Sequence, residues 1–513
     1  MTAHSDPAIL ALVRGVLWPG FLGRTVPDWL QRELAGGLAG VVLFAQNIDE
    51  RDPEQLPGLT AALGSLGQNT LIGIDEEGGN VTRLESARGS TLPGHAQLGA
   101  VDDEELTRAT GTELARRVGA AGVNVALAPD ADVNTEPRNP VIGVRSFGTD
   151  PSLVARHVAA MVDGIQAGGV VACAKHYPGH GDTSADSHTD LPRSNSDWER
   201  MLREHLPPFD AAIAAGVRAI MTAHILVPGL GTSPATLNSG VLGSLRERGF
   251  TGAIVTDALD MAAIRGTVGS GPGAVRALVA GSDLLCIGNP ANPGNSGSAA
   301  PAGSDADAYV EVKQAICDAI DDGSLPLAVL ERAAANVADL GRWAADRADA
   351  RRDAVHAAVP RLTIDSIVSA AIRTAGAVPQ LTGAARVLDL RHRATIAVAT
   401  ETDVLTTALA DGGAAESIRL PPSAEGAFSD AVRSATVTAP DGLVVLVDRI
   451  GVPGAQTEAI AVIRGIRPDA VVVNVGMPAG DEANGLVPIV ETLGDSLASA
   501  TVVARLLRTG NAA

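Results

Sequence analysis

The stretch PSLVARHVAAMVDGIQAGGVVACAKH, residues 151–176, contains the pattern that decides the fold of this chain. Residues 151–167 have the composition of a helix, and two glycines separate them from a short run at 170–175 that is apolar up to its lysine. A strand without alternating polar residues is typical of a parallel sheet that is covered on both faces. This stretch therefore predicts a helix followed by a parallel strand with polar residues at its end.

The same unit recurs along the first two thirds of the chain. Short apolar runs rich in Val and Ile alternate with helical stretches such as 102–121 and 197–215. Eight such strands with helices between them predict a (β/α)8 TIM barrel, an α/β fold, over residues 1–345. The predicted strands are 15–21, 40–44, 71–75, 123–128, 170–175, 219–223, 253–257 and 283–287.

A second α/β pattern follows the barrel. Residues 342–359 are rich in Ala, Arg and Asp and predict a helix that leads into a linker at 346–360. Beyond this linker, a smaller layered α/β domain is expected at 361–513. Its predicted strands are 395–400, 417–420, 442–447 and 470–475, and its predicted helices are 455–465 and 496–507.

The composition limits the partners and the compartment that are expected. The 513 residues carry a formal net charge of −20, which disfavours binding to nucleic acid or to an anionic membrane. Three cysteines form no disulfide framework, and we find neither a signal peptide nor an apolar run of membrane-spanning length. We therefore expect a cytoplasmic protein that acts on a small molecule, and no cofactor is predicted.

Polar and titratable residues gather directly after the predicted barrel strands. Asp75 follows the third strand, Lys175 and His176 end the fifth, His224 follows the sixth and Asp257 ends the seventh. In a barrel, these positions all lie on the C-terminal rim, where active sites are built. Convergence of separate segments on one rim is stronger evidence for a site than any single motif.

The segment at residues 175–188 is the densest of these rim segments. It holds one lysine, three histidines and two aspartates among fourteen residues, with Gly179 and Gly181 between them. In the pair Asp186-x-His188, the carboxylate can hold the imidazole tautomer and raise its basicity, which suits His188 to proton transfer. Two alternatives stay open, a solvated loop and a metal site built from the histidines and aspartates. Because no H-E-x-x-H helix or cysteine pair accompanies them, no metal is predicted.

Three further segments carry residues suited to binding or cleaving a sugar. Residues 74–83 hold three acids, two glycines and Arg83, and their alternative interpretation is a turn with a surface salt bridge. Residues 254–261 place Asp257 at a strand end, as a nucleophile, a general base or a helix cap. Residues 138–148 hold two arginines, including Arg145, suited either to binding oxygen atoms or to structural pairing with carboxylates.

Taken together, these four segments resemble glycoside hydrolase family 3, and specifically its bacterial β-N-acetylglucosaminidase branch. The matching pieces are 75–83, 145–148 with Asp150-Pro151, 175–188, and Thr256-Asp257-x-Leu259-x-Met261. The piece at 175–188 is long and specific. The resemblance covers residues 10–345 and extends more weakly to the C-terminal domain, which is similar to the α/β sandwich domain of the family.

The resemblance implies hydrolysis of terminal β-linked N-acetylglucosamine by a retaining double displacement. Asp257 would be the nucleophile, and His188, oriented by Asp186, would be the general acid/base in place of the usual carboxylic acid. The residues that would bind the sugar are Asp75, Arg83, Arg145, Lys175 and His176. Recycling of cell-wall muropeptides is a process that fits a cytoplasmic enzyme of this branch.

A histidine acid/base leaves a rival reaction open. After giving up its proton the imidazole is neutral, so it does not repel an anionic acceptor as a glutamate would. Some members of this branch use phosphate and release a sugar 1-phosphate, so a phosphorylase is the alternative within the family. A sugar-binding barrel without turnover and a metal-dependent hydrolase are alternatives of other classes. The oligomeric state is left at monomer or homodimer.

Overall fold

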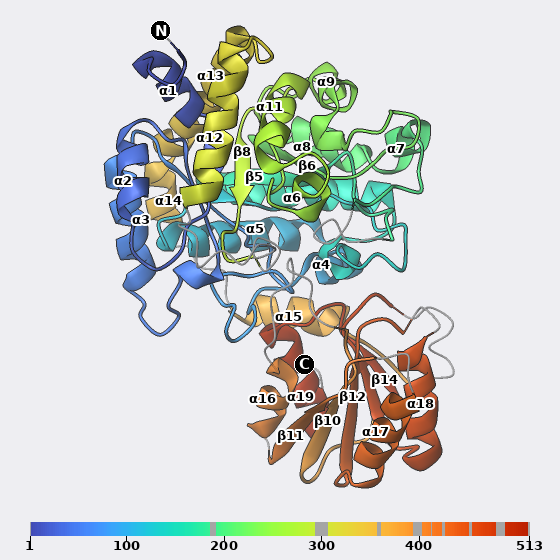
Figure 1. Cartoon of the computed structure of the whole chain (residues 1–513). Coiled ribbons are helices and arrows are strands. Elements are labelled where there is room, and N and C mark those ends of the chain that lie inside the picture. Colours follow the sequence, from blue (N-terminus) through green and yellow to red (C-terminus); the bar gives the residue numbers. More distant parts are fainter. Residues whose placement is uncertain are drawn as a thin grey trace. The chain divides into compact units, whose positions relative to one another are not determined.

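The computed structural model divides into two compact units (Figure 1). The first unit comprises Met1–Glu77, Thr107–Val133 and Thr149–Ala358, and the second comprises Gly78–Leu106, Asn134–Gly148 and Val359–Ala513. The structure describes residues 2–184, 191–292, 306–355, 361–392, 403–411, 413–422, 426–450, 454–478 and 488–510. The domain boundaries predicted at 345 and 361 stay predictions. The division adds that two segments from the first half of the chain group with the C-terminal part.

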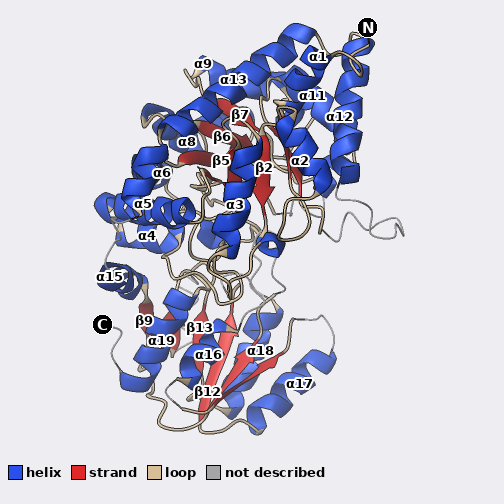
Figure 2. Ribbon diagram, turned by 90° about the vertical axis from the view of Figure 1, so that its left-hand side faces the viewer, coloured by secondary structure: helices blue, strands red, loops and turns tan. Residues whose placement is uncertain are grey.

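Parallel strands form the core of the first unit, and all eight predicted strands are confirmed within its described part. Strands β2 to β7 pair in sequence order, β8 pairs with β1, and a bridge between Val255 and Leu284 joins β7 to the start of β8. Figure 2 shows these strands enclosed by helices, as expected for a (β/α)8 barrel. The strands are β1 (Leu17–Pro19), β2 (Gly40–Leu43), β3 (Leu71–Ile74), β4 (Val125–Ala126), β5 (Val171–Tyr177), β6 (Ala219–Thr222), β7 (Ala253–Val255) and β8 (Leu285–Gly288).

The helices of this unit follow the strands along the chain. Helix α6 begins after Asp150, whose side chain accepts from the N–H of Ser152, and Pro151 stands in its first turn, where a missing N–H costs nothing. The helices are α1 (Pro7–Arg14), α2 (Asp28–Ala35), α3 (Gln55–Leu66), α5 (Glu104–Ala120), α6 (Pro151–Ala167), α7 (Trp198–Glu204), α8 (Pro207–Ala214), α9 (Ser239–Glu247), α10 (Ala262–Arg265), α11 (Ser270–Ala280), α12 (Ala306–Asp321), α13 (Leu327–Asp346) and α14 (Ala348–Ala354).

One predicted helix is divided into two in the structure, so the prediction of a single helix is wrong. The sequence pattern predicts a single helix over 197–215, whereas the structure has α7 and α8 with a break at His205 and Leu206. Pro207 and Pro208 begin α8. A proline has no backbone N–H, and its ring clashes with the carbonyl four residues earlier, so neither residue can continue α7.

Trp18 fills the barrel interior, which has few other aromatic side chains. It is fully buried within a cluster of Val, Leu, Ala, Met and Cys side chains, and its Nε1 donates to Leu71 O at 2.9 Å. Gly73 on β3 makes room for the ring, because a Cβ added there would lie 2.2 Å from Trp18 Cζ2. The indole ring of Trp18 therefore packs directly on the backbone of Gly73, where any side chain would clash with it.

The C-terminal part of the second unit is a three-layer α/β structure. Its sheet has the order β11-β10-β12-β13-β14-β9, parallel except for the antiparallel edge strand β9. Alternate residues of each central strand pack on opposite faces. Val444 and Leu446 of β12 face α16 and α19, whereas Val445 and Val447 face α17 and α18. Figure 2 shows the two helical layers around the sheet, so the predicted α/β sandwich is confirmed.

The local patterns predicted only part of this second sheet. Strands at 417–420, 442–447 and 470–475 and both predicted helices are confirmed, the strand at 395–400 lies outside the described residues, and β9, β10 and β14 were not predicted. The elements are α4 (His95–Val101), α15 (Arg361–Ala371), β9 (Arg373–Ala375), β10 (Ala385–Asp389), α16 (Val404–Ala410), β11 (Ala415–Arg419), α17 (Gly426–Val437), β12 (Gly442–Val447), α18 (Ala455–Ile466), β13 (Val471–Asn474), β14 (Ile489–Glu491) and α19 (Leu497–Thr509). Within the described part of the chain, no helix is both long and apolar enough to cross a bilayer.

Candidate active site

Lys175 lies within β5 and joins two segments of the barrel rim. Its side chain is only 2% exposed, and its Nζ lies 2.8 Å from Asp75 Oδ1 and 2.7 Å from Glu77 Oε1. A buried ammonium is tolerated when carboxylates pair with it, so these contacts hold the lysine charged beneath the rim. The structure therefore brings together the predicted residues Lys175 and Asp75. It adds Glu77, to which the sequence assigned no role of its own.

His176 is held by a carboxylate that follows β4. Its Nδ1 lies 2.8 Å from Asp132 Oδ2, and Asp132 Oδ1 also accepts from the backbone N–H of His180 at 2.5 Å. Burial alone would raise the pKa of Asp132, but the neighbouring His176 and the bonds from His176 and His180 hold it well below its usual range. An ionised carboxylate only accepts, so Nδ1 carries a proton, and Asp132 selects the tautomer whose Nε2 is the acceptor.

The described start of the 175–188 segment is tightly packed. Gly179 has φ +129°, a value that favours glycine, and a Cβ there would lie 2.7 Å from His205 Cβ. Asp182 Oδ2 accepts from Ser196 Oγ at 2.5 Å. Burial lowers the pKa of His180 to about 4, so this ring is neutral near pH 7. The predicted proton-transfer pair Asp186 and His188 lies outside the described residues, and its role stays a prediction.

Asp257 follows β7 and is half-buried. Its Oδ1 accepts from the N–H of Ala258 at 2.8 Å, and His224 Nε2 donates to Ala258 O at 3.0 Å. Asp257 and Asp75 both raise the pKa of the buried thiol of Cys173, whose burial is the main cause of its pKa of about 12. Strands β3 to β7 run parallel, so the carboxylates that follow β3 and β7 lie at the same end of the barrel.

The alternative interpretation of the acids after β7 as helix caps is wrong. Helix α10 begins only after Met261, and no side chain caps it. Asp260 Oδ2 instead accepts from Asn289 N at 3.1 Å and from Asn292 Nδ2 at 2.9 Å, which holds the segment that follows β8. Asp257 does not cap this helix, and its role as the nucleophile stays a prediction.

Arg83 and Arg145 belong to the second unit, in Gly78–Leu106 and Asn134–Gly148. Both side chains are buried. Arg145 Nη1 donates to Val141 O at 3.2 Å, and its own carbonyl accepts from His95 Nδ1 at 2.6 Å. Their binding of a sugar stays a prediction.

A metal ion would find one candidate set of ligands among the described residues. Asp130, Asp132 and His176 each offer a ligand atom, all within 4.8 Å of one another. Two carboxylates and one imidazole are chemically suitable for Zn²⁺ or a similar cation. However, His176 Nδ1 already bonds Asp132, and it lies 4.0 Å from Asp130 Oδ2, so a metal would have to displace that bond.

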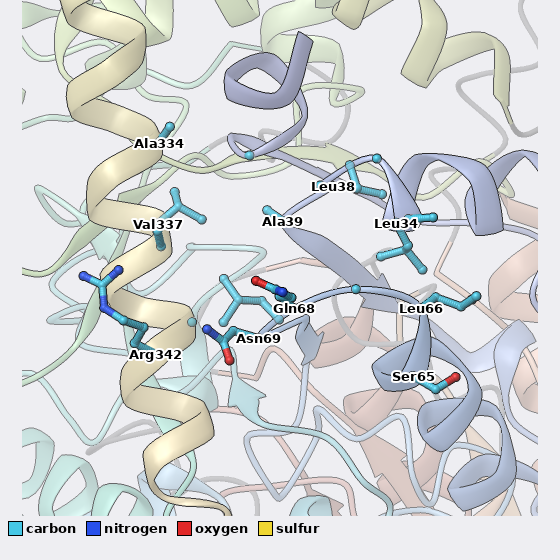
Figure 3. A pocket seen from close by; sticks show the side chains of 18 residues that line it. Leu34, Leu38, Ala39, Ser65, Leu66, Gln68, Asn69, Ala334, Val337 and Arg342 are labelled. Atoms are coloured by element: carbon cyan, nitrogen blue, oxygen red, sulfur yellow. The ribbon is translucent and has the colours of Figure 1, made fainter. Parts of the chain in front are cut away.

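A cavity of about 810 Å³ lies elsewhere on the first unit (Figure 3). Its lining includes Leu38 and Ala39 before β2, Asn69 before β3, and Val337 of α13. These positions precede the strands, whereas Asp75, Lys175 and Asp257 lie at or near strand ends, so the cavity is at the opposite end of the barrel. Arg342 is the one charged side chain among its lining residues, so it offers no acid/base pair.

Sequence reasoning missed Asp130 and Asp132, and it placed Glu77 on the rim without giving it a role of its own. The first two follow β4 and are fully buried, and Asp132 holds His176. The rule that pointed to the third, fifth, sixth and seventh strands would have found them at the fourth, because they follow the end of β4 within six residues. Their pairing partners were not predictable, since they come from distant parts of the chain.

The comparisons with known proteins agree on one family. A β-hexosaminidase A from Pseudoalteromonas piscicida is 37% identical over 251 residues, which is 44% of this chain and 42% of that protein. A β-hexosaminidase from Xylella fastidiosa (strain 9a5c) is 38% identical over 272 residues, 51% of this chain and 79% of that protein. This chain thus spans less than half of the Pseudoalteromonas protein.

Solved structures extend the similarity to both units. A glycoside hydrolase family 3 β-N-acetylglucosaminidase from Paenibacillus sp. str. FPU-7 has a TM-score of 0.81 at 28% identity, covering 97% of this chain and 96% of that one. The model of the glycosyl hydrolase family 3 N terminal domain matches residues 23–340, more than half of this chain. With the barrel and the acidic rim in place, the chain belongs to glycosyl hydrolase family 3.

Proposed function

We propose that this protein is a retaining β-N-acetylglucosaminidase that removes terminal β-linked N-acetylglucosamine. The observation that carries the proposal is the arrangement on the barrel rim. Lys175 is bound by Asp75 and Glu77, and His176 is oriented by Asp132. Asp257 follows β7, which runs parallel to β5, so it belongs to the same end of the barrel. The names of the β-hexosaminidase relatives and of the Paenibacillus structure support the choice of sugar.

In the first step, Asp257 attacks the anomeric carbon while His188, oriented by Asp186, gives its proton to the departing oxygen. The bond to the aglycone breaks, and an ester between the sugar and Asp257 forms. In the second step, neutral His188 takes a proton from water, the water oxygen replaces Asp257, and N-acetylglucosamine leaves with its original configuration. Asp75, Lys175 and His176 would bind the sugar hydroxyls, together with Arg83 and Arg145.

The covalent step is tested with a glycoside that carries fluorine at C2. Such a substrate lacks the 2-acetamido group and cannot supply its own nucleophile, so the enzyme has to do so. We expect mass spectrometry to find the sugar on the peptide that contains Asp257. An intact protein without an adduct, or Asp257→Asn turning over at the wild-type rate, would remove Asp257 from the mechanism.

The proton-transfer role of His188 is tested by varying the leaving group. His188→Ala should lose about 10²–10⁴-fold in kcat on a disaccharide, and much less on a dinitrophenyl glycoside, whose leaving group needs little protonation. Equal losses on both substrates would contradict the acid/base role. Asp186→Asn should show the same dependence to a smaller degree, because it acts through the imidazole.

The choice between water and phosphate as acceptor follows from the same histidine. Because His188 would be neutral after protonating the leaving group, an anionic acceptor is not repelled, and a phosphorylase is the second candidate function. One assay of 4-nitrophenyl N-acetylglucosaminide with and without phosphate, with product analysis, separates the two. We expect free N-acetylglucosamine in both samples, whereas sugar 1-phosphate as the main product would make this protein a phosphorylase.

The natural substrate and the compartment belong to the same proposal. We infer a cytoplasmic enzyme that acts on cell-wall muropeptides with terminal N-acetylglucosamine, and chitooligosaccharides are the competing substrate. A comparison of kcat/KM for the two substrates decides between them, and cell fractionation tests the compartment. A non-catalytic sugar-binding barrel would instead bind both ligands without releasing product.

A further inference from the structure

Two segments that leave the barrel rim are bonded to the C-terminal part of the second unit. Gly78–Leu106 continues directly from Glu77, and Asn134–Gly148 continues from Val133. They carry Arg83 and Arg145. Both segments and their partners 492–499 belong to one compact unit, so their mutual geometry is part of that unit.

The first connection is through Asn80. Its Oδ1 accepts from the N–H of Asp495 at 2.7 Å, and ten residues further along the segment Ser90 O accepts from Ala498 N at 3.1 Å. Asp495 is itself held by Arg391, whose guanidinium also bonds Asp389 at the end of β10. The segment that contains Arg83 is therefore hydrogen-bonded at two points to the residues just before α19 and at its start.

The second connection is through Gln97 of α4. This side chain is fully buried, and its Nε2 donates to Thr492 O and to Ser499 Oγ, both at 2.8 Å. Its Oε1 accepts from Gly94 N at 2.9 Å. Both N–H donors and the oxygen of the Gln97 amide are hydrogen-bonded. Its orientation is fixed, because turning the buried amide would leave these groups without partners, which costs free energy.

His95, on the same helix as Gln97, bonds the backbone of Arg145. It stands two residues before Gln97 and donates from Nδ1 to Arg145 O at 2.6 Å. Its ring also packs on Phe147, with the centroids 4.4 Å apart. The backbone of Arg145 is thus tied through α4 to residues 492–499 of the C-terminal part.

We propose that residues 492–499 are a positioning element for Arg83 and Arg145, acting through Asn80, Gln97 and His95. When a segment becomes ordered only on ligand binding, the loss of its conformational entropy weakens the binding of the ligand. A segment that is already ordered does not incur this loss. The C-terminal part of the unit thereby sets the affinity for the sugar through the two arginines. This inference rests on the proposed function, because that function assigns sugar binding to the two arginines.

The test compares two buried glutamines of the same unit in the full-length protein. Gln97→Met keeps the length of the side chain and removes its hydrogen bonds. Gln456→Met does the same in α18, where the glutamine bonds Leu390 O and Asp448 instead. KM and kcat for 4-nitrophenyl N-acetylglucosaminide are measured for both variants and for Asn80→Ala. Hydrogen exchange is followed in residues 78–106 and 134–148, with thermal unfolding as the check on stability.

We expect Gln97→Met and Asn80→Ala to raise KM about five- to tenfold with little change in kcat, since they remove uniform binding. Gln456→Met should leave KM within about twofold at a similar loss of stability. Exchange in residues 134–148 should quicken in Gln97→Met alone. An unchanged KM or unchanged exchange in Gln97→Met, or an equal rise of KM in Gln456→Met, would overturn the proposal. A wild-type protein that does not cleave the glycoside would overturn the proposed function, and the exchange comparison would still decide the positioning.

Discussion

Replacing Asp132 by asparagine should disable the site while leaving its shape in place. Asp132 accepts from His176 Nδ1 at 2.8 Å and from His180 N at 2.5 Å, and it is fully buried. An asparagine oxygen can keep one of these bonds, but its amide nitrogen is a donor and would face a ring nitrogen that also donates. The imidazole would have to take its other tautomer, which turns Nε2 from an acceptor into a donor.

The size of the effect follows from the bond that is lost. A hydrogen bond to a charged group is worth about 1.5–3 kcal/mol, and the asparagine variant loses about one of them. If this energy stabilises the transition state, kcat/KM falls roughly ten- to one-hundred-fold. The pKa of Asp132 is depressed in the folded protein, so its contribution to stability is present above the ordinary carboxyl pKa and is lost as pH falls below it. The variant should accordingly lose stability at pH 7 and less at low pH.

The assay is kcat/KM for 4-nitrophenyl N-acetylglucosaminide, with urea unfolding at pH 7 and pH 3. Asp130→Asn is the matched control, because Asp130 is equally buried and its Oδ2 lies 4.0 Å from His176 Nδ1, beyond hydrogen-bonding distance. We expect the control to lose less activity than Asp132→Asn. Wild-type turnover by Asp132→Asn, or equal losses in the two variants, would refute the orienting role of Asp132.

Three further predictions follow from the packing and the charges. Gly73→Ala should lower the free energy of unfolding by about 1–3 kcal/mol, because the new Cβ would lie 2.2 Å from the Trp18 ring; urea unfolding measures it. Gly58→Ala is its control, since nothing lies within 4 Å of that position in α3, and it should be neutral or stabilising. His180, with a pKa of about 4 in the folded protein and about 6.5 when unfolded, should cost on the order of 3 kcal/mol of stability as pH falls from 6.5 to 4. His180→Asn should flatten the stability profile in that window, and an unchanged profile would place the titrating group elsewhere. Exhaustive chelation should leave kcat/KM within about twofold if Asp130, Asp132 and His176 hold no catalytic metal, and loss with recovery on adding Zn²⁺ would show the opposite.

The barrel was largely predictable because its evidence is local. A parallel strand covered on both faces is apolar along most of its length, and the eight apolar runs predicted in the first unit overlap its eight strands. Polar side chains at the ends of such strands, or just after them, lie on the rim, which led to Asp75, Lys175, His176 and Asp257. The break between α7 and α8 was also encoded locally, by two prolines that the helical pattern masked.

The second sheet was harder to predict, because β9, β10 and β14 each contain a charged residue and so give no uninterrupted apolar run. Their pairing with neighbouring strands decides that they are strands. Sequence alone determined where the chemical groups stand along the chain, since burial and turn formation leave local patterns. Only the tertiary structure decided what each group touches. Lys175 meets Asp75 from 100 residues away, and His176 meets Asp132 from 44 residues away. Such partners depend on which strand ends become neighbours, and no local pattern records that choice.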